Sequence, residues 1–149
     1  MKKLLVLIMC LVLLISYSSP VKAVENGEVV YSDEYSLDDG LTVHREVVVY
    51  SQNRSSTKTA QNKNSIYDGD TLVAVIVLQA TFRYDGSSVS VVSKSVTQSD
   101  TYDGWTYVQN SLTSSGGTVT LSAKLTKWII LNTSFTMTLS CDKDGNISY

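Results

Sequence analysis

Residues 71–84 read TLVAVIVLQATFRY, and this stretch decides the fold class. Alternate residues from Leu72 to Tyr84 form one apolar face of this segment. In its first half, Val73, Val75 and Val77 make the opposite face apolar as well. Its β-branched residues and two-residue period predict a long strand rather than a helix. A strand apolar on both faces is expected to be central and covered on both sides. The first face consists of Leu72, Ala74, Ile76, Leu78, Ala80, Phe82 and Tyr84.

Other segments alternate in the same way, which predicts further half-buried strands at 41–50, 88–97, 105–112, 118–127 and 133–141. Within them, the change of parity between Val91 and Val92 predicts a β-bulge. Residues 52–65 are almost wholly polar, which predicts either a loop or a solvated edge strand.

Turn signals separate these segments. Five of the 8 glycines follow an aspartate, and this pair supplies the positive backbone angles that tight hairpin turns require. The sequence therefore predicts an all-β fold, an antiparallel β-sandwich of immunoglobulin-like size with seven or eight strands. A small closed β-barrel is the alternative. The five glycines are Gly40, Gly69, Gly86, Gly104 and Gly145.

Composition excludes two classes of protein. The chain has 149 residues, of which 43% are hydrophobic and 17% charged, so it is not a disordered charged tail. Its formal net charge of -2 argues against binding to nucleic acid, which needs a basic surface.

The N-terminal segment has the pattern of a secretory signal peptide. Lys2 and Lys3 precede an apolar run over residues 4–15, which is too short to span a bilayer. We expect cleavage after Ala23 and a secreted, extracellular protein. The predicted organisation is a signal peptide over 1–23, an acidic arm over 24–40 and one β-sandwich domain over 41–149. Within the arm, residues 29–31 are an alternative short edge strand.

No set of residues predicts catalysis or metal binding. The single histidine, His44, lies in a predicted strand. A catalytic triad would also need a nucleophile on a sharp turn, and the sequence has no Gly-x-Ser-x-Gly motif of that kind. Cys141 has the parity of a buried residue. Residues 142–146 and 68–70 lack the spacing of a calcium loop and are expected to be turns. Acidic side chains are available for glycoside hydrolysis, but no spacing singles out a pair among Asp38, Asp39, Asp68 and Asp103. We expect no catalytic residue, no metal site and no cofactor.

Residues 127–132 read KWIILN and place an apolar tip between two alternating strands. Hairpin tips are normally polar. One interpretation is a tip folded over the end of the core, and another is a membrane-inserting hairpin over 118–141. The third is an interaction patch made by Trp128, Ile129, Ile130 and Leu131.

Residues 79–89 (QATFRYDGSSV) and 140–146 (SCDKDGN) resemble small secreted proteins of Gram-positive bacteria, a group of unknown function. The resemblance covers about Ile66 to Ser148 and implies secretion and a β-rich fold, without any catalytic or ligand residue. The favoured function is a non-enzymatic binding module. Its partner would be an extracellular protein, a glycan or a cell-surface component. A membrane-active protein that makes contact through the 127–132 tip and a glycan-acting hydrolase are the alternatives.

Overall fold

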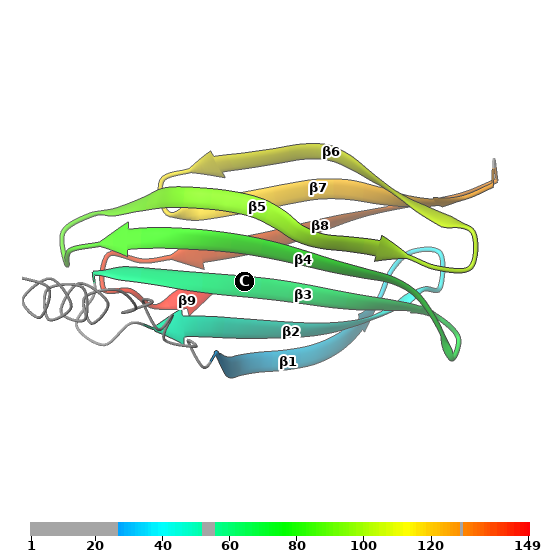
Figure 1. Ribbon diagram of the computed structural model, residues 1–149, viewed down its shortest axis with the longest axis horizontal. Helices are drawn as coiled ribbons and strands as arrows, with labels where there is room; N and C mark the ends of the chain where they lie inside the picture. The colour runs from blue at the N-terminus through cyan, green and yellow to red at the C-terminus, as the bar shows by residue number, and fades with distance from the viewer. Residues whose placement is uncertain (1–26, 52–55, 129) are drawn as a thin grey trace, which may run out of the picture.

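The computed structural model describes residues 27–51, 56–128 and 130–149, and it confirms the predicted all-β sandwich. Two antiparallel sheets pack face to face and do not close into a barrel (Figure 1). The predicted signal peptide and its cleavage site lie outside the described residues. The strands are β1 Glu28–Ser36, β2 Thr42–Ser51, β3 Thr57–Asp68, β4 Thr71–Tyr84, β5 Val89–Thr101, β6 Trp105–Ser115, β7 Thr118–Lys127, β8 Leu131–Cys141 and β9 Ile147–Ser148.

Strand order in both sheets follows the sequence. The first sheet has the order β1-β2-β3-β4-β5 and the second the order β6-β7-β8-β9. Each strand therefore pairs with its sequence neighbour, and the connection from β5 to β6 carries the chain to the other sheet. In the part of the chain that the structure describes, no helix is long and apolar enough to cross a membrane.

The core lies between the two sheets, as the alternation of residues predicts. The larger sheet contributes β4 residues such as Ile76, Leu78 and Phe82, all fully buried. The smaller sheet contributes one face of β7 and of β8, namely Val119, Leu121, Ala123, Leu125, Phe135, Met137 and Leu139. The outer faces of these two strands carry mostly serine and threonine.

The position of β4 differs from the prediction of a central strand covered on both sides. It is the fourth of five strands, and β3 is the middle one. Val75 and Val77 point away from the core cluster, yet both are buried. Val77 lies between Lys63 on β3 and Gln98 on β5, so cross-strand neighbours shield this face where a further layer was expected.

The expectation of a loop or an edge strand over 52–65 is wrong from Thr57 onward. Strand β3 pairs with β2 on one side and with β4 on the other. The pattern was obscured because Asn62 and Asn64 occupy the core face between Ala60 and Ile66. Residues 52–55 lie outside the described part of the chain.

The acidic stretch also differs from the expected arm. Residues Glu28–Ser36 form β1, a nine-residue strand at the edge of the larger sheet, longer than the alternative over 29–31. With the two-residue β9, this strand brings the described residues to nine strands.

The sheets overlap only in part. The smaller sheet packs mainly on β3, β4 and β5, whereas β1 extends beyond it (Figure 1). The offset of the sheets leaves the inner face of β1 and β2 partly uncovered by the second sheet.

The predicted bulge is confirmed, because Thr81 pairs with Ser93 and Phe82 with Val91, which leaves Val92 as the extra residue.

Candidate functional site

The tip of the β7–β8 hairpin is apolar and exposed. Trp128 is 77% exposed, Ile130 84% and Leu131 42%, while Ile129 lies outside the described residues. Figure 1 shows this hairpin projecting at one end of the molecule. The interpretation in which the tip folds over the core is therefore wrong for Trp128 and Ile130. Three of the four residues of the predicted patch are brought together on the surface.

The backbone of the tip is strained. Trp128 has a φ of 54°, in the left-handed region that side chains other than glycine and asparagine seldom adopt. Such a conformation costs about 1–2 kcal/mol. The turn therefore presents an indole to solvent at a position where glycine would be more stable.

A cation supports the base of the tip. The Lys127 Nζ donates to Asp103 Oδ2 at 2.7 Å. The same ammonium lies 5.7 Å from the ring of Trp105, which is buried, and 5.5 Å from the ring of Trp128. Cation–π attraction and the ion pair tie the end of β7 to the start of β6. These contacts therefore hold the residue that precedes the tip in a fixed position.

A second cluster lies on the inner face of β1 and β2, where the smaller sheet no longer covers them. Arg45 binds Asp33 with two hydrogen bonds, from Nε at 2.8 Å and from a terminal nitrogen at 2.5 Å. The Tyr31 hydroxyl donates to the same carboxylate at 3.0 Å. The Arg45 guanidinium also lies 5.3–5.5 Å from the rings of Tyr31, Tyr35 and Tyr149. We call these five residues the Arg45 cluster.

The ionisation of the cluster follows from these contacts. The hydrogen bonds from Arg45 lower the pKa of Asp33, and burial raises the pKa of Tyr35. The sequence analysis did not single out this cluster. The available signal was the parity of Arg45, which lies between Val43 and Val47 on the face that points to the core.

A shallow hollow of ≈ 400 Å³ lies at the end of β1 and β9. Its lining contains two titratable groups, and one of them, Lys58, donates from Nζ to the backbone oxygen of Gly145. The hollow therefore brings no pair of carboxylates together. Its walls are Glu28, Val30, Val49, Lys58, Asn146 and Ile147.

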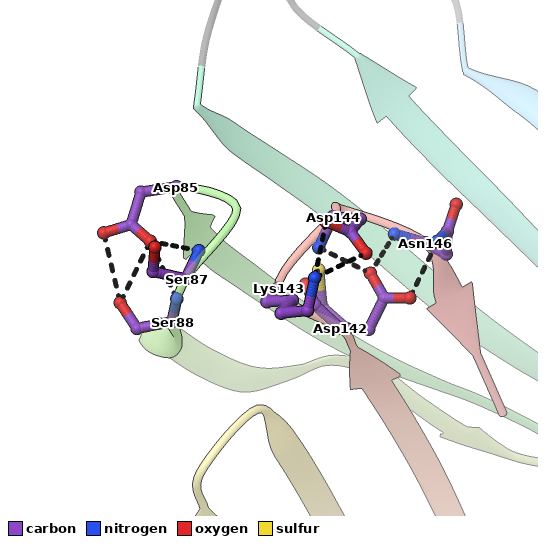
Figure 2. Close-up of polar contacts among 8 residues, drawn as sticks. Asp85, Ser87, Ser88, Asp142, Lys143, Asp144 and Asn146 are labelled. Atoms are coloured by element: carbon purple, nitrogen blue, oxygen red, sulfur yellow. Dashed lines mark hydrogen bonds and ion pairs between the residues drawn. The ribbon is translucent and has the colours of Figure 1, made fainter.

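Two aspartate turns close the neighbouring end of the sandwich (Figure 2). Asp142 accepts hydrogen bonds from the backbone N–H of Asp144 at 2.9 Å and of Asn146 at 2.8 Å. Asp85 accepts bonds from the N–H of Ser87 at 2.9 Å and of Ser88 at 2.7 Å. The pKa of Asp142 is lowered mainly by a side-chain hydrogen bond from Asn146. The pKa of Asp85 is lowered mainly by the hydrogen bond from the Ser87 backbone N–H. Both carboxylates bind their own turns, as expected for residues 142–146.

The remaining candidate side chains do not converge. The His44 Nε2 lies 3.2 Å from Glu34 Oε2 on the exposed outer face of the larger sheet. Cys141 is buried, and burial raises the pKa of its thiol. Asp39 accepts a bond from Thr133 at 2.6 Å. Among the described residues, no group of three or more His, Cys, Asp or Glu side chains is placed to hold a metal ion.

Comparisons of the chain with protein-family models, with curated proteins and with solved structures found no match.

Proposed function

We propose that this chain is a secreted, non-enzymatic binding module that engages an extracellular partner through the β7–β8 tip. The observation that carries the proposal is the exposure of Trp128 and Ile130 at the end of a projecting hairpin. Tryptophan is, with tyrosine and arginine, enriched among the residues that dominate the binding energy of protein interfaces. An indole with neighbouring aliphatic side chains fits an apolar pocket on a partner protein.

The strain at Trp128 supports this proposal. Residues held in sparsely populated backbone regions cluster at binding and catalytic sites. The Lys127–Asp103 ion pair fixes the base of the tip before any partner arrives, which reduces the entropy lost on binding.

Insertion of the whole 118–141 hairpin into a membrane is less favourable than docking of its tip. The apolar faces of β7 and β8 are buried against the larger sheet. Exposing each valine or leucine of this face would cost about 1.5–3 kcal/mol before any lipid contact forms. The strands are therefore expected to stay in the sandwich, with the tip as the part of this hairpin that contacts a membrane.

Peripheral contact of the tip with a lipid surface is the second candidate. It is favoured by the arrangement of Lys127 beside Trp128, since an aromatic ring and a neighbouring cation suit the membrane–water interface.

The test compares Trp128→Ser with Val92→Ser, a matched change at another exposed apolar residue. Labelled protein is mixed with intact cells of the source organism, with protease-treated cells, and with protein-free anionic or neutral vesicles. Binding that protease treatment abolishes, and that only Trp128→Ser weakens, supports a protein partner. Binding to vesicles with the same dependence supports the lipid candidate. Equal binding by both variants on every surface would overturn the proposal.

A further inference from the structure

Strand β8 has a free edge. On one side β8 pairs with β7 over its whole length, from Lys127 opposite Leu131 to Thr118 opposite Ser140. On the other side β9 pairs only with Ser140 and Cys141. Within the described ranges, no strand pairs with residues 131–139 on that side.

This edge differs from the other long edges of the sandwich, each of which carries a β-bulge. The extra residue is Val30 in β1, Val92 and Thr97 in β5, and Asn110 in β6. Bulges at an edge hinder pairing with a foreign strand. The register of β8 on β7 is unbroken, so its free edge keeps the regular geometry that a further strand needs.

The backbone groups that face this edge can be assigned. The Cys141 N–H donates to Gly117 O on the β7 side at 2.9 Å. The Thr138 carbonyl instead accepts from Asn62 Nδ2, which reaches it from β3 at 3.0 Å. In an antiparallel strand, the N–H and C=O groups of successive residues point to opposite edges. Cys141 directs its N–H to β7, so every second residue counted from Ser140 back to Ser134 directs its backbone groups to the other edge. Among residues 131–139, this set includes Ser134, Thr136 and Thr138.

Two buried acceptors lie on β3, and the side chain of Asn62 is the one that contacts this edge. Asn62 and Asn64 are each 1% exposed, and the Oδ1 atom of each has no hydrogen-bond partner among the described residues. A buried acceptor without a donor costs about 1–3 kcal/mol. Asn62 already extends its amide nitrogen to the Thr138 carbonyl, so its unpartnered Oδ1 lies beside the part of the edge that a further segment would cover.

We propose that the free edge of β8, from Ser134 to the N–H of Thr138, accepts one extended peptide segment of a partner as a further strand of the smaller sheet. Such strand addition takes its affinity from main-chain hydrogen bonds and its specificity from alternate side chains. The bond between Thr133 and Asp39 bounds the site at one end. Strand β9, followed by Tyr149, bounds it at the other.

The offset of the sheets selects the occupant. β1 and β2 extend past the β8 edge (Figure 1), so they would collide with the second layer of another sandwich. A lone segment has no second layer and fits. Its outward side chains would continue the hydroxyl rows of the outer face, in which Thr120 pairs with Thr138 and Ser122 with Thr136. Its inward side chains would meet the tyrosine rings of the Arg45 cluster, so we expect them to be apolar or aromatic.

The probe is a synthetic peptide with the sequence of β7, TVTLSAKLTK, since β8 already pairs with this sequence on its other side. In the free chain, the N–H groups of Ser134 and Thr136 are expected to exchange quickly with solvent and those of Phe135 and Met137 slowly. Saturating peptide is expected to slow exchange at Ser134 and Thr136. A peptide N-methylated at alternate residues should bind about tenfold more weakly, because it cannot form the ladder.

The matched variants are Thr136→Pro and Thr136→Val. Proline removes the N–H that faces the edge and is tolerated on edge strands, whereas valine keeps it. We expect about tenfold weaker binding for Thr136→Pro and little change for Thr136→Val. Should Thr136→Pro fail to fold, the N-methylated peptide tests the same hydrogen bonds.

Three results would overturn the proposal. The first is unchanged exchange at Ser134 and Thr136 with the β7 peptide at millimolar concentration. The second is equal binding of the β7 peptide and its N-methylated form. The third is slow exchange in the chain without peptide that depends on protein concentration, which would indicate a second copy at the edge. Trp128→Ser is expected to bind the peptide normally, so this site and the tip are tested separately.

Discussion

The inner face of β1 and β2 and the tip of the β7–β8 hairpin distribute polar and apolar side chains in opposite ways. On the first, Arg45 and Asp33 lie on the parity of buried valines, and their side chains are only 22% and 26% exposed. At the second, Trp128 is 77% exposed. The charged pair is sheltered although the smaller sheet does not cover it, because tyrosine rings and a bidentate ion pair satisfy it. The tryptophan has no comparable shelter. The difference indicates that the Arg45 cluster stabilises the fold, whereas the tip adds little packing to it.

Arg45→Ala is expected to produce the largest loss of stability. It leaves the sheltered Asp33 carboxylate without its main partner and removes the cation packed against three tyrosine rings. The free energy of unfolding should fall by about 2–3 kcal/mol in urea denaturation. Lys63→Ala breaks a more exposed pair with Glu46 and should cost about 0–1 kcal/mol. Equal losses would remove the contrast between the sheltered and the exposed pair.

Acid should weaken the same cluster. Arg45 lowers the pKa of Asp33 from 3.8, so protons bind the unfolded chain more readily than the folded one. The stabilisation is therefore complete above about pH 4 and is lost as the pH falls through the lowered pKa. Between about pH 5 and pH 2, we expect the parent chain to lose about 0.5–1 kcal/mol more than Asp33→Asn. Parallel pH profiles of the two proteins would contradict this expectation.

Trp128→Gly should leave stability unchanged or raise it by up to about 1 kcal/mol, because glycine relieves the left-handed backbone. Trp128→Ala keeps the strain and serves as the control. Thermal unfolding should therefore place the glycine variant above the alanine variant. The reverse order would show that residue 128 does not hold the left-handed conformation that costs alanine stability.

The smallest effect is spectroscopic. Trp105 is buried and Trp128 exposed, so Trp128→Phe should remove most of the acrylamide quenching of tryptophan fluorescence. Stability should change by less than about 0.5 kcal/mol, as for other surface substitutions. Strong quenching that persists in Trp128→Phe would place the accessible indole at Trp105 instead.

Strands with an uninterrupted apolar parity were predicted from the sequence. The alternation in 118–127 matches β7 residue for residue, and the parity change at Val91–Val92 located the bulge in β5. Strand β3 was predicted only as a solvated edge strand or a loop, because Asn62 and Asn64 place polar groups on the core face and the alternation disappears. Their amide nitrogens depend on acceptors that other strands supply, the Thr138 carbonyl from β8 and the Tyr35 hydroxyl from β1. Such partners are distant in sequence.

The candidate sites divide in the same way. The composition of the tip was predicted, because its apolar run is local, but its exposure depends on where the hairpin ends relative to the other sheet. The Arg45 cluster joins β1, β2 and the residue after β9, which no local pattern connects. The free edge of β8 depends on the short pairing with β9, and two residues of strand carry too little periodicity to predict.

The sequential order of the strands has a consequence for how the chain acquires its structure. Every pairing within a sheet is closed by a local hairpin, and only the step from β5 to β6 requires the two halves to meet. Folds dominated by local pairings form faster than those that must first close long loops. A polypeptide delivered N-terminus first would therefore complete its five-stranded layer before the second layer emerges, and the apolar face of that layer would remain wet until β7 and β8 arrive to cover it.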